Sequence, residues 1–203
     1  MKVLGIIGSP RKNGNTDILV DSVLQGVKEK GFEVEKIYLS DLDFKGCIAC
    51  EGCRKTCKCV LKDDLEDVYV KSEESDGIVL GSPTYFYNVT WLTKKFLDRL
   101  YAYEVFDETD RSVWLSPNEV NGSKYAVTVS ICEQETIENM GFTSDAMNLT
   151  LQSVGWRTVE SIKALYLYER GEAEAEYELK ERSKKAGVKL TKTIILADKT
   201  RSI

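Results

Sequence analysis

The chain has 203 residues, a formal net charge of −5 and no histidine. This length suits one domain with a real core, so we predict a single domain over residues 1–203. The acidic balance gives no reason to expect nucleic acid or an anionic membrane as a partner. The lack of histidine excludes Ser-His-Asp catalysis, histidine-ligated zinc and histidine acid–base chemistry. Chemistry at neutral pH would therefore come from a cofactor or a metal centre, and we expect no catalytic side chain.

No apolar run in the sequence is long enough to span a bilayer. The N-terminus enters a predicted strand at once, without a signal peptide, so the expected location is cytoplasmic. Six cysteines in that reducing compartment indicate metal or redox chemistry rather than disulfides.

The first distinctive feature along the chain is a polar loop between a predicted strand and a predicted helix. An apolar run over 3–7 leads into Gly-Ser-Pro-Arg-Lys-Asn-Gly-Asn-Thr at 8–16, and apolar residues at helical spacing follow. Such a turn presents backbone N–H groups at the positive end of a helix, where a phosphate binds. The candidate ligands in this loop are Ser9, Arg11, Asn13, Asn15 and Thr16.

The glycine spacing narrows the kind of phosphate ligand. Gly5, Gly8 and Gly14 do not form the dinucleotide fingerprint G-x-G-x-x-G, and no Gly-Lys-Ser/Thr of a P-loop follows. A hydroxyl-rich loop that holds a mononucleotide phosphate remains, as does an ordinary strand-to-helix turn with a polar cap.

The first helix should end at Gly31, and a second strand is predicted over 32–39. A cysteine-rich run comes after this strand. Five cysteines occupy the thirteen positions 47–59, and the first three have the spacing C-x2-C-x2-C. This spacing lets one loop supply three thiolates to a cubane cluster. Cys57 and Cys59 are both candidates for the fourth ligand. A zinc site and a metal-free reduced loop are the alternatives to a cluster. Asp63 or Asp64 should cap the helix that follows.

A second candidate loop follows a third strand over 76–81. It reads Ser-Pro-Thr-Tyr-Phe-Tyr-Asn at 82–88, and we expect it beside the first loop because both follow neighbouring parallel strands. Asn88 either contacts a cofactor or caps the following helix. Three adjacent aromatic residues also suit core packing or an oligomer interface. The candidate cofactor contacts of this loop are Pro83, Thr84, Tyr85, Phe86, Tyr87 and Asn88.

The remaining chain alternates between helix and strand. We predict helices over 91–101, 137–154 and from 171 onward, and strands over 124–131 and 157–167. We predict that the acidic segment 104–123 is irregular. It would serve as a lid, as an oligomer contact or as a plain surface excursion. Cys132 reads as a buried small hydrophobe, and Glu133 should lie in a third loop at the same sheet edge. Five strands in this alternation predict an α/β flavodoxin-like doubly wound parallel sheet with the order 2-1-3-4-5.

The motifs together resemble a known family. Gly-Ser-Pro-Arg-Lys-Asn-Gly-Asn-Thr at 8–16 resembles the FMN-phosphate loop of the NAD(P)H-dependent FMN reductases, and Gly-Ser-Pro-Thr-Tyr at 81–85 resembles their flavin-ring loop. The cysteine run and its acidic tail are most similar to the iron–sulfur flavoprotein branch, and the resemblance covers nearly the whole chain. It implies FMN on the two loops and a [4Fe–4S] cluster on Cys47, Cys50, Cys53 and Cys59.

The resemblance implies a redox flavoprotein that transfers electrons through FMN and the cluster. The alternative is an NAD(P)H-dependent FMN or quinone reductase with a metal-free cysteine loop, and a different class is a non-enzymatic zinc-stabilised binding module. The implied partners are an electron donor such as NAD(P)H or reduced ferredoxin and a small-molecule or protein acceptor. A homodimer or homotetramer is expected by the same resemblance.

Overall fold

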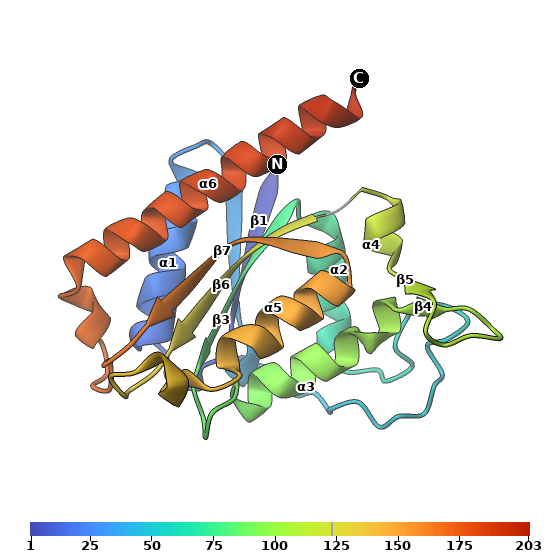
Figure 1. Ribbon diagram of the computed structural model, residues 1–203, viewed down its shortest axis with the longest axis horizontal. Coiled ribbons are helices and arrows are strands. Elements are labelled where there is room, and N and C mark those ends of the chain that lie inside the picture. The colour runs from blue at the N-terminus through green and yellow to red at the C-terminus, as the bar shows by residue number, and fades with distance from the viewer. Residues whose placement is uncertain (123) are drawn as a thin grey trace.

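Five parallel strands form the central sheet of the computed structural model, which describes residues 1–122 and 124–203 (Figure 1). Their order, β2-β1-β3-β6-β7, confirms the predicted flavodoxin-like order 2-1-3-4-5. The inner strands β1 and β3 are buried along almost their whole length, which explains their apolar sequences. The strands are β1 (Lys2–Ile7), β2 (Glu33–Tyr38), β3 (Gly77–Pro83), β6 (Lys124–Ile131) and β7 (Trp156–Ala164).

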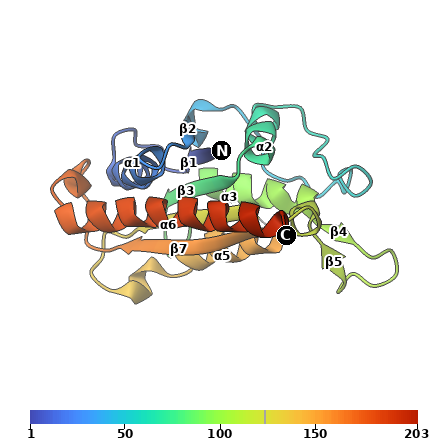
Figure 2. The same ribbon diagram turned by 90° about the horizontal axis from the view of Figure 1, so that it is seen from above.

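Helices cover both faces of this sheet (Figures 1 and 2). One face packs against α1 (Asn15–Lys28) and α6 (Tyr177–Arg201), and the other packs against α2 (Leu65–Glu74), α3 (Trp91–Arg99) and α5 (Thr143–Ser153). The predicted apolar stripe of the first helix is fully buried at Leu19, Val23 and Val27.

The two helices α1 and α6 cross with their backbones in close contact. A Cβ atom on Gly26 would lie 2.0 Å from the carbonyl oxygen of Lys184, and one on Gly187 would lie 2.0 Å from that of Val23. No side chain fits at either position. This crossing places the loop that precedes α6 beside the loop that precedes α1.

Several predicted helices are shorter than expected because a turn interrupts them. The predicted helix 137–154 divides at Gly141, whose φ of 53° is left-handed, into a 3-10 turn (Ile137–Met140) and α5. The last helix likewise begins with a separate 3-10 turn (Glu172–Glu174) before α6. Further 3-10 turns span Leu39–Asp41 and Leu100–Tyr103.

The prediction that segment 104–123 is irregular is wrong for its described part. Residues 104–122 contain an antiparallel pair, β4 (Val105–Phe106) and β5 (Trp114–Leu115), and a short helix α4 (Pro117–Val120). The Phe106 and Trp114 rings lie opposite each other with centroids 6.4 Å apart, which explains why these strands pair. Ser123, the last residue of the segment, lies outside the described residues.

Within residues 1–122 and 124–203, no helix has the length and apolar character needed to cross a membrane. Cys132 is 2% exposed, as predicted for a small buried hydrophobe.

Candidate cofactor pocket and cysteine cavity

The carboxyl ends of β1 and β3 form one small pocket with the start of α1. Its volume is about 100 Å³. Most residues around it come from the two predicted loops: Ser9, Arg11, Gly14, Asn15, Thr16, Pro83, Thr84 and Tyr85. Ile131 and Glu133 also line it, so the third loop after β6 reaches the same sheet edge as predicted. The leading N–H groups of α1 have no intrahelical acceptor, and no side chain caps them. The pocket therefore offers hydroxyls, backbone N–H groups and a guanidinium to one anion, with one carboxylate, that of Glu133, in its wall.

Buried hydrogen bonds hold the two loops together. The Gly8 N–H donates to the Gly81 carbonyl at 2.8 Å, and the Thr90 hydroxyl donates to the Gly8 carbonyl at 2.5 Å. A Cβ atom on Gly8 would lie 1.8 Å from the Thr93 hydroxyl oxygen, so glycine is required at this contact. Thr90 also caps α3 by accepting the Thr93 N–H. Of the two roles considered for Asn88, the helix cap therefore belongs to Thr90 instead.

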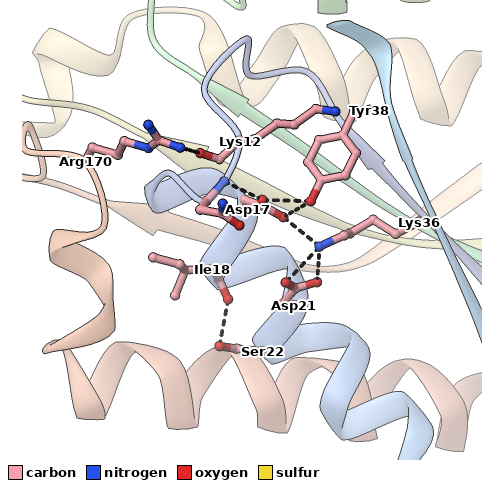
Figure 3. Close-up of polar contacts among 9 residues, drawn as sticks. Lys12, Asp17, Ile18, Asp21, Ser22, Lys36, Tyr38 and Arg170 are labelled. Carbon is pink, nitrogen blue, oxygen red and sulfur yellow. Dashed lines mark hydrogen bonds and ion pairs between the residues drawn. The ribbon is translucent and has the colours of Figure 1, made fainter. Parts of the chain in front are cut away.

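Beneath the first loop lies a buried carboxylate, that of Asp17 (Figure 3). It accepts the Asn13 N–H at 2.8 Å, the Lys36 ammonium at 2.8 Å and the Tyr38 hydroxyl at 2.9 Å. Burial alone would raise the pKa of Asp17, but the hydrogen bonds from Lys36, Asn13 and Tyr38 outweigh it and hold the pKa below its ordinary value. The carboxylate thus stays ionised and fixes the loop from its inner side. Asn13 itself does not line the pocket.

The segment between β7 and α6 completes the pocket, and sequence reasoning missed it. Tyr168 and Arg170 line the pocket, and an Arg170 guanidinium nitrogen donates to the Lys12 carbonyl at 2.5 Å (Figure 3). The Asn15 side chain donates to the Glu169 carbonyl at 2.9 Å and accepts the Ala173 N–H at 3.0 Å. Asn15, predicted as a phosphate ligand, thus binds this segment with its side chain.

The aromatic turn beside the pocket has an unusual backbone. Phe86 and Tyr87 have φ angles of 45° and 64°, a left-handed conformation that bulky residues rarely adopt. Tyr85 and Asn88 exchange two backbone hydrogen bonds across the turn, and the Phe142 N–H donates to the Tyr87 carbonyl at 2.7 Å. Phe86 is 98% exposed as a result. Phe86, Tyr87 and Asn88 do not line the pocket, whereas Tyr85 does.

A second and larger cavity lies in the cysteine loop. Its volume is about 530 Å³, and Cys47, Cys50, Cys53 and Cys59 all line it. Cys57 lines a different pocket of about 110 Å³ together with Tyr69. Burial raises the pKa of the Cys53 thiol, and the other three cysteines of the cavity raise it further. The loop therefore gathers the four predicted ligands around one space and turns Cys57 away from it.

The cysteines do not form a site for a single ion. Among residues 1–122 and 124–203, no three cysteine, aspartate or glutamate side chains are close enough to hold one metal ion. A cubane cluster places one thiolate at each of four iron corners, so its ligands stand further apart than those of a single zinc ion.

The helix start after the cysteine loop uses both acidic residues of the predicted cap. Asp64 occupies the N-cap position of α2, but its carboxylate accepts the Asp43 N–H at 2.7 Å rather than a helix N–H. Asp63 accepts the Leu65 N–H at 3.3 Å.

The pocket and the cavity lie at opposite ends of α3. Thr90, at the start of the helix, contacts the first loop, and Arg99, at its end, lines the cysteine cavity. The helix Trp91–Arg99 has nine residues and is therefore about 13.5 Å long. Figure 2 shows the cysteine loop, between β2 and α2, extending from the sheet on the side of β4 and β5.

The sheet order and the polar pocket at its carboxyl edge define a doubly wound protein of the flavodoxin-like class. Residues 1–131 match the family model described as NADPH-dependent FMN reductase. The chain belongs to this family.

Individual relatives agree with this assignment. An iron-sulfur flavoprotein of Methanocaldococcus jannaschii is 46% identical over 99 residues, or 49% of this chain and 51% of that protein. The chain thus spans about half the length of the curated relatives it matches. A solved flavone reductase has a TM-score of 0.72 at 20% identity, over 96% of this chain and 63% of the other. A flavodoxin from the domain Archaea has a TM-score of 0.57 at 15% identity, over 96% and 99%. These two structures show the shared fold.

Proposed function

We propose that this chain is an oxidoreductase of the iron–sulfur flavoprotein type, which transfers electrons through FMN and a [4Fe–4S] cluster. The observation that carries the proposal is the convergence of Cys47, Cys50, Cys53 and Cys59 on one cavity of about 530 Å³. The similarity to proteins named iron-sulfur flavoproteins supports it.

The phosphate pocket fits the phosphate end of FMN. Its volume of about 100 Å³ is well below the roughly 300 Å³ of the smallest typical small-molecule pockets. It therefore encloses the phosphate end, where Ser9, Thr16 and the first N–H groups of α1 supply donors. The surface beside it that remains for the flavin ring carries Tyr85, Phe86 and Tyr87, which are 42%, 98% and 55% exposed.

The cavity fits a cluster in the chemistry of its donors. Four cysteines from one loop line it, and Arg99 lies in its wall. Thiolates are the usual ligands of [4Fe–4S] clusters. Bound together, a flavin and a cluster would link two-electron to one-electron chemistry. The protein's part is to hold both groups, and no side chain acts as acid or base.

The surface of the cysteine loop favours a negatively charged protein as electron donor. Residues 45–62 carry five basic side chains and one acidic one, although the whole chain has a net charge of −5. All five are exposed: Lys45, Arg54, Lys55, Lys58 and Lys62. Such a patch speeds encounter with an acidic carrier, for example a reduced ferredoxin, and NAD(P)H is the other donor we propose.

The proposal extends to assembly and location. The exposed turn Phe86–Tyr87 suits an interface in a homodimer or homotetramer. Six free thiols fit the reducing environment of the cytosol. We further propose that the chain is a single domain.

Anaerobic purification with an absorption spectrum and assays of iron, sulfide and zinc tests the proposal. We expect flavin bands with a broad brown shoulder, and iron and sulfide in equal amounts. Flavin bands without iron would favour an NAD(P)H-dependent FMN or quinone reductase with a metal-free loop. A colourless protein with zinc and no flavin would contradict the proposal entirely.

A further inference from the structure

Arg99 closes the cysteine loop at its base. The side chain is 2% exposed and lies in the wall of the cysteine cavity. One guanidinium nitrogen donates to the Lys45 carbonyl at 2.9 Å and to the Asp63 carboxylate at 2.8 Å, and the other donates to Asp63 at 3.2 Å. Lys45 precedes the first cysteine and Asp63 follows the last. One buried cation therefore joins both ends of the loop.

Two polar groups in this region have no hydrogen-bond partner. They are the Nε–H of Arg99 and the hydroxyl of Tyr69, and both are buried. The two groups lie near each other, since Arg99 counters the rise that burial causes in the pKa of Tyr69, and neither donates to a cysteine sulfur in this structure. A buried donor without an acceptor is costly, and such groups in native proteins usually serve an ion, a water or a ligand. No other donor of Arg99 is left unused, because the second terminal nitrogen also donates to the Leu61 carbonyl at 3.5 Å.

Cys59 is the cysteine whose surroundings include both donors. Cys59 lines the cysteine cavity together with Arg99, and it lines the neighbouring small pocket together with Tyr69. Burial would lower the pKa of Arg99, but Asp63, Tyr69 and Cys59 together raise it. Burial raises the pKa of Tyr69, and Cys59 raises it further while Arg99 opposes the shift. Arg99 and Tyr69 thus each line a cavity that Cys59 also lines.

We propose that Arg99 and Tyr69 are positioning residues for the cluster: Arg99 closes the loop, and with the cluster bound both donate hydrogen bonds to sulfur at Cys59. The inference rests on the proposed function. Reduction adds one electron and no proton, so these donors and the buried positive charge favour the reduced form. The pair therefore raises the reduction potential of the bound cluster.

A potentiometric titration of reconstituted protein, followed by electron paramagnetic resonance, tests the donors. Tyr69→Phe removes only an unpartnered hydroxyl, and we expect at least a threefold loss in the equilibrium preference for the reduced cluster. Arg99→Gln also removes the charge. We expect at least a tenfold loss in the same preference, which corresponds to a fall of about 59 mV in the reduction potential for one electron. Tyr103→Phe and Arg157→Gln are the matched controls, because Tyr103 binds Glu73 and Arg157 is an exposed cation that lies over the Tyr125 ring, outside the cysteine loop. Neither control should change the potential.

Hydrogen exchange in the iron-free protein tests the closure of the loop. The N–H groups of Lys45 and Leu65 donate to the Asp63 carboxylate that Arg99 holds. We expect at least tenfold faster exchange of both in Arg99→Gln, and no change in Tyr69→Phe. Unchanged exchange in Arg99→Gln would overturn the closing role, and an unchanged potential in Tyr69→Phe would overturn the donor role. A parent protein that takes up no iron would instead contradict the proposed function, and the exchange result would still decide the closing role.

Discussion

The Asp17 carboxylate accepts the backbone N–H of Asn13 at 2.8 Å, and this bond holds Asn13 in a left-handed turn with a φ of 54°. Asp17 lies in the first turn of α1, so the helix fixes the loop that leads into it. Lys36 and Tyr38 of β2 bind the same carboxylate (Figure 3). The shape of the phosphate pocket therefore depends on a buried charge that does not itself line the pocket.

Replacing that charge should weaken the fold in a pH-dependent way. We expect Asp17→Asn to lower the free energy of unfolding at pH 7 by about 1.5–3 kcal/mol, because charged hydrogen bonds are lost. The folded pKa of Asp17 is lowered, so its contribution is complete above the unfolded value of about 3.9 and disappears as pH falls through the folded value. Urea unfolding at pH 7 and near pH 3 measures this difference, which should shrink in acid. Asp21→Asn, at a 54%-exposed partner of the same lysine, should cost under about 1 kcal/mol, and an equal loss there would contradict the role of burial.

The phosphate pocket should distinguish FMN from riboflavin. We expect Ser9→Ala and Thr16→Ala each to weaken FMN roughly ten- to a hundredfold, because a hydrogen bond to a dianion is lost. Riboflavin, which lacks the phosphate, should bind these variants almost as well as it binds the parent. Titration of flavin fluorescence gives both affinities. Ser22→Ala is a matched control on α1, since that hydroxyl donates to the Ile18 carbonyl. Equal losses for the two ligands would place the phosphate elsewhere.

Relieving the strain in the aromatic turn should raise the stability of the fold and weaken flavin binding. Asparagine tolerates a left-handed backbone better than phenylalanine does, so Phe86→Asn should raise the free energy of unfolding by about 1 kcal/mol. The same change removes an exposed ring from the surface proposed for the flavin and for assembly. We expect FMN and riboflavin to weaken by a similar factor, in contrast to the hydroxyl variants. A stability that falls in thermal unfolding would show that the Phe86 ring is needed for packing rather than strained.

Hydride transfer from NAD(P)H should depend little on pH between about 6 and 8. The chain has no histidine, and an unperturbed histidine is the side chain that titrates in this range. Stopped-flow reduction of the bound flavin isolates this step. A steep profile with a single ionisation would mean that a cysteine or carboxylate takes part, against our account of a cofactor acting without a side-chain acid or base.

The sequence predicts the fold because each central strand is a short apolar run that ends in a polar loop. The order of those runs determines which loops share the sheet edge, so Ser9, Thr16 and Thr84 could be placed together. Arg170 could not be placed there, because it arrives through the crossing of α1 and α6. That crossing depends on the absence of side chains at Gly26 and Gly187, and neither glycine signals a helix contact by itself.

The cysteine cavity, too, was predictable from the sequence only in part. Spacing alone left Cys57 and Cys59 in competition for the fourth place. The structure distinguishes their surroundings because Cys57 has a left-handed φ of 52° and lines a separate pocket. The closing role of Arg99 was not predictable, since its partners Lys45 and Asp63 lie 54 and 36 residues away in sequence.

Iron and sulfide content after anaerobic reconstitution of Cys59→Ser and Cys57→Ser tests the central claim most directly. Cys59 lines the cavity with Cys47, Cys50 and Cys53, whereas Cys57 does not. We predict that Cys59→Ser loses or severely destabilises the cluster while it keeps FMN, and that Cys57→Ser holds as much iron and sulfide per chain as the parent. The reverse result, with Cys57→Ser empty and Cys59→Ser loaded, would contradict the assignment, and a parent without iron would contradict the cluster itself.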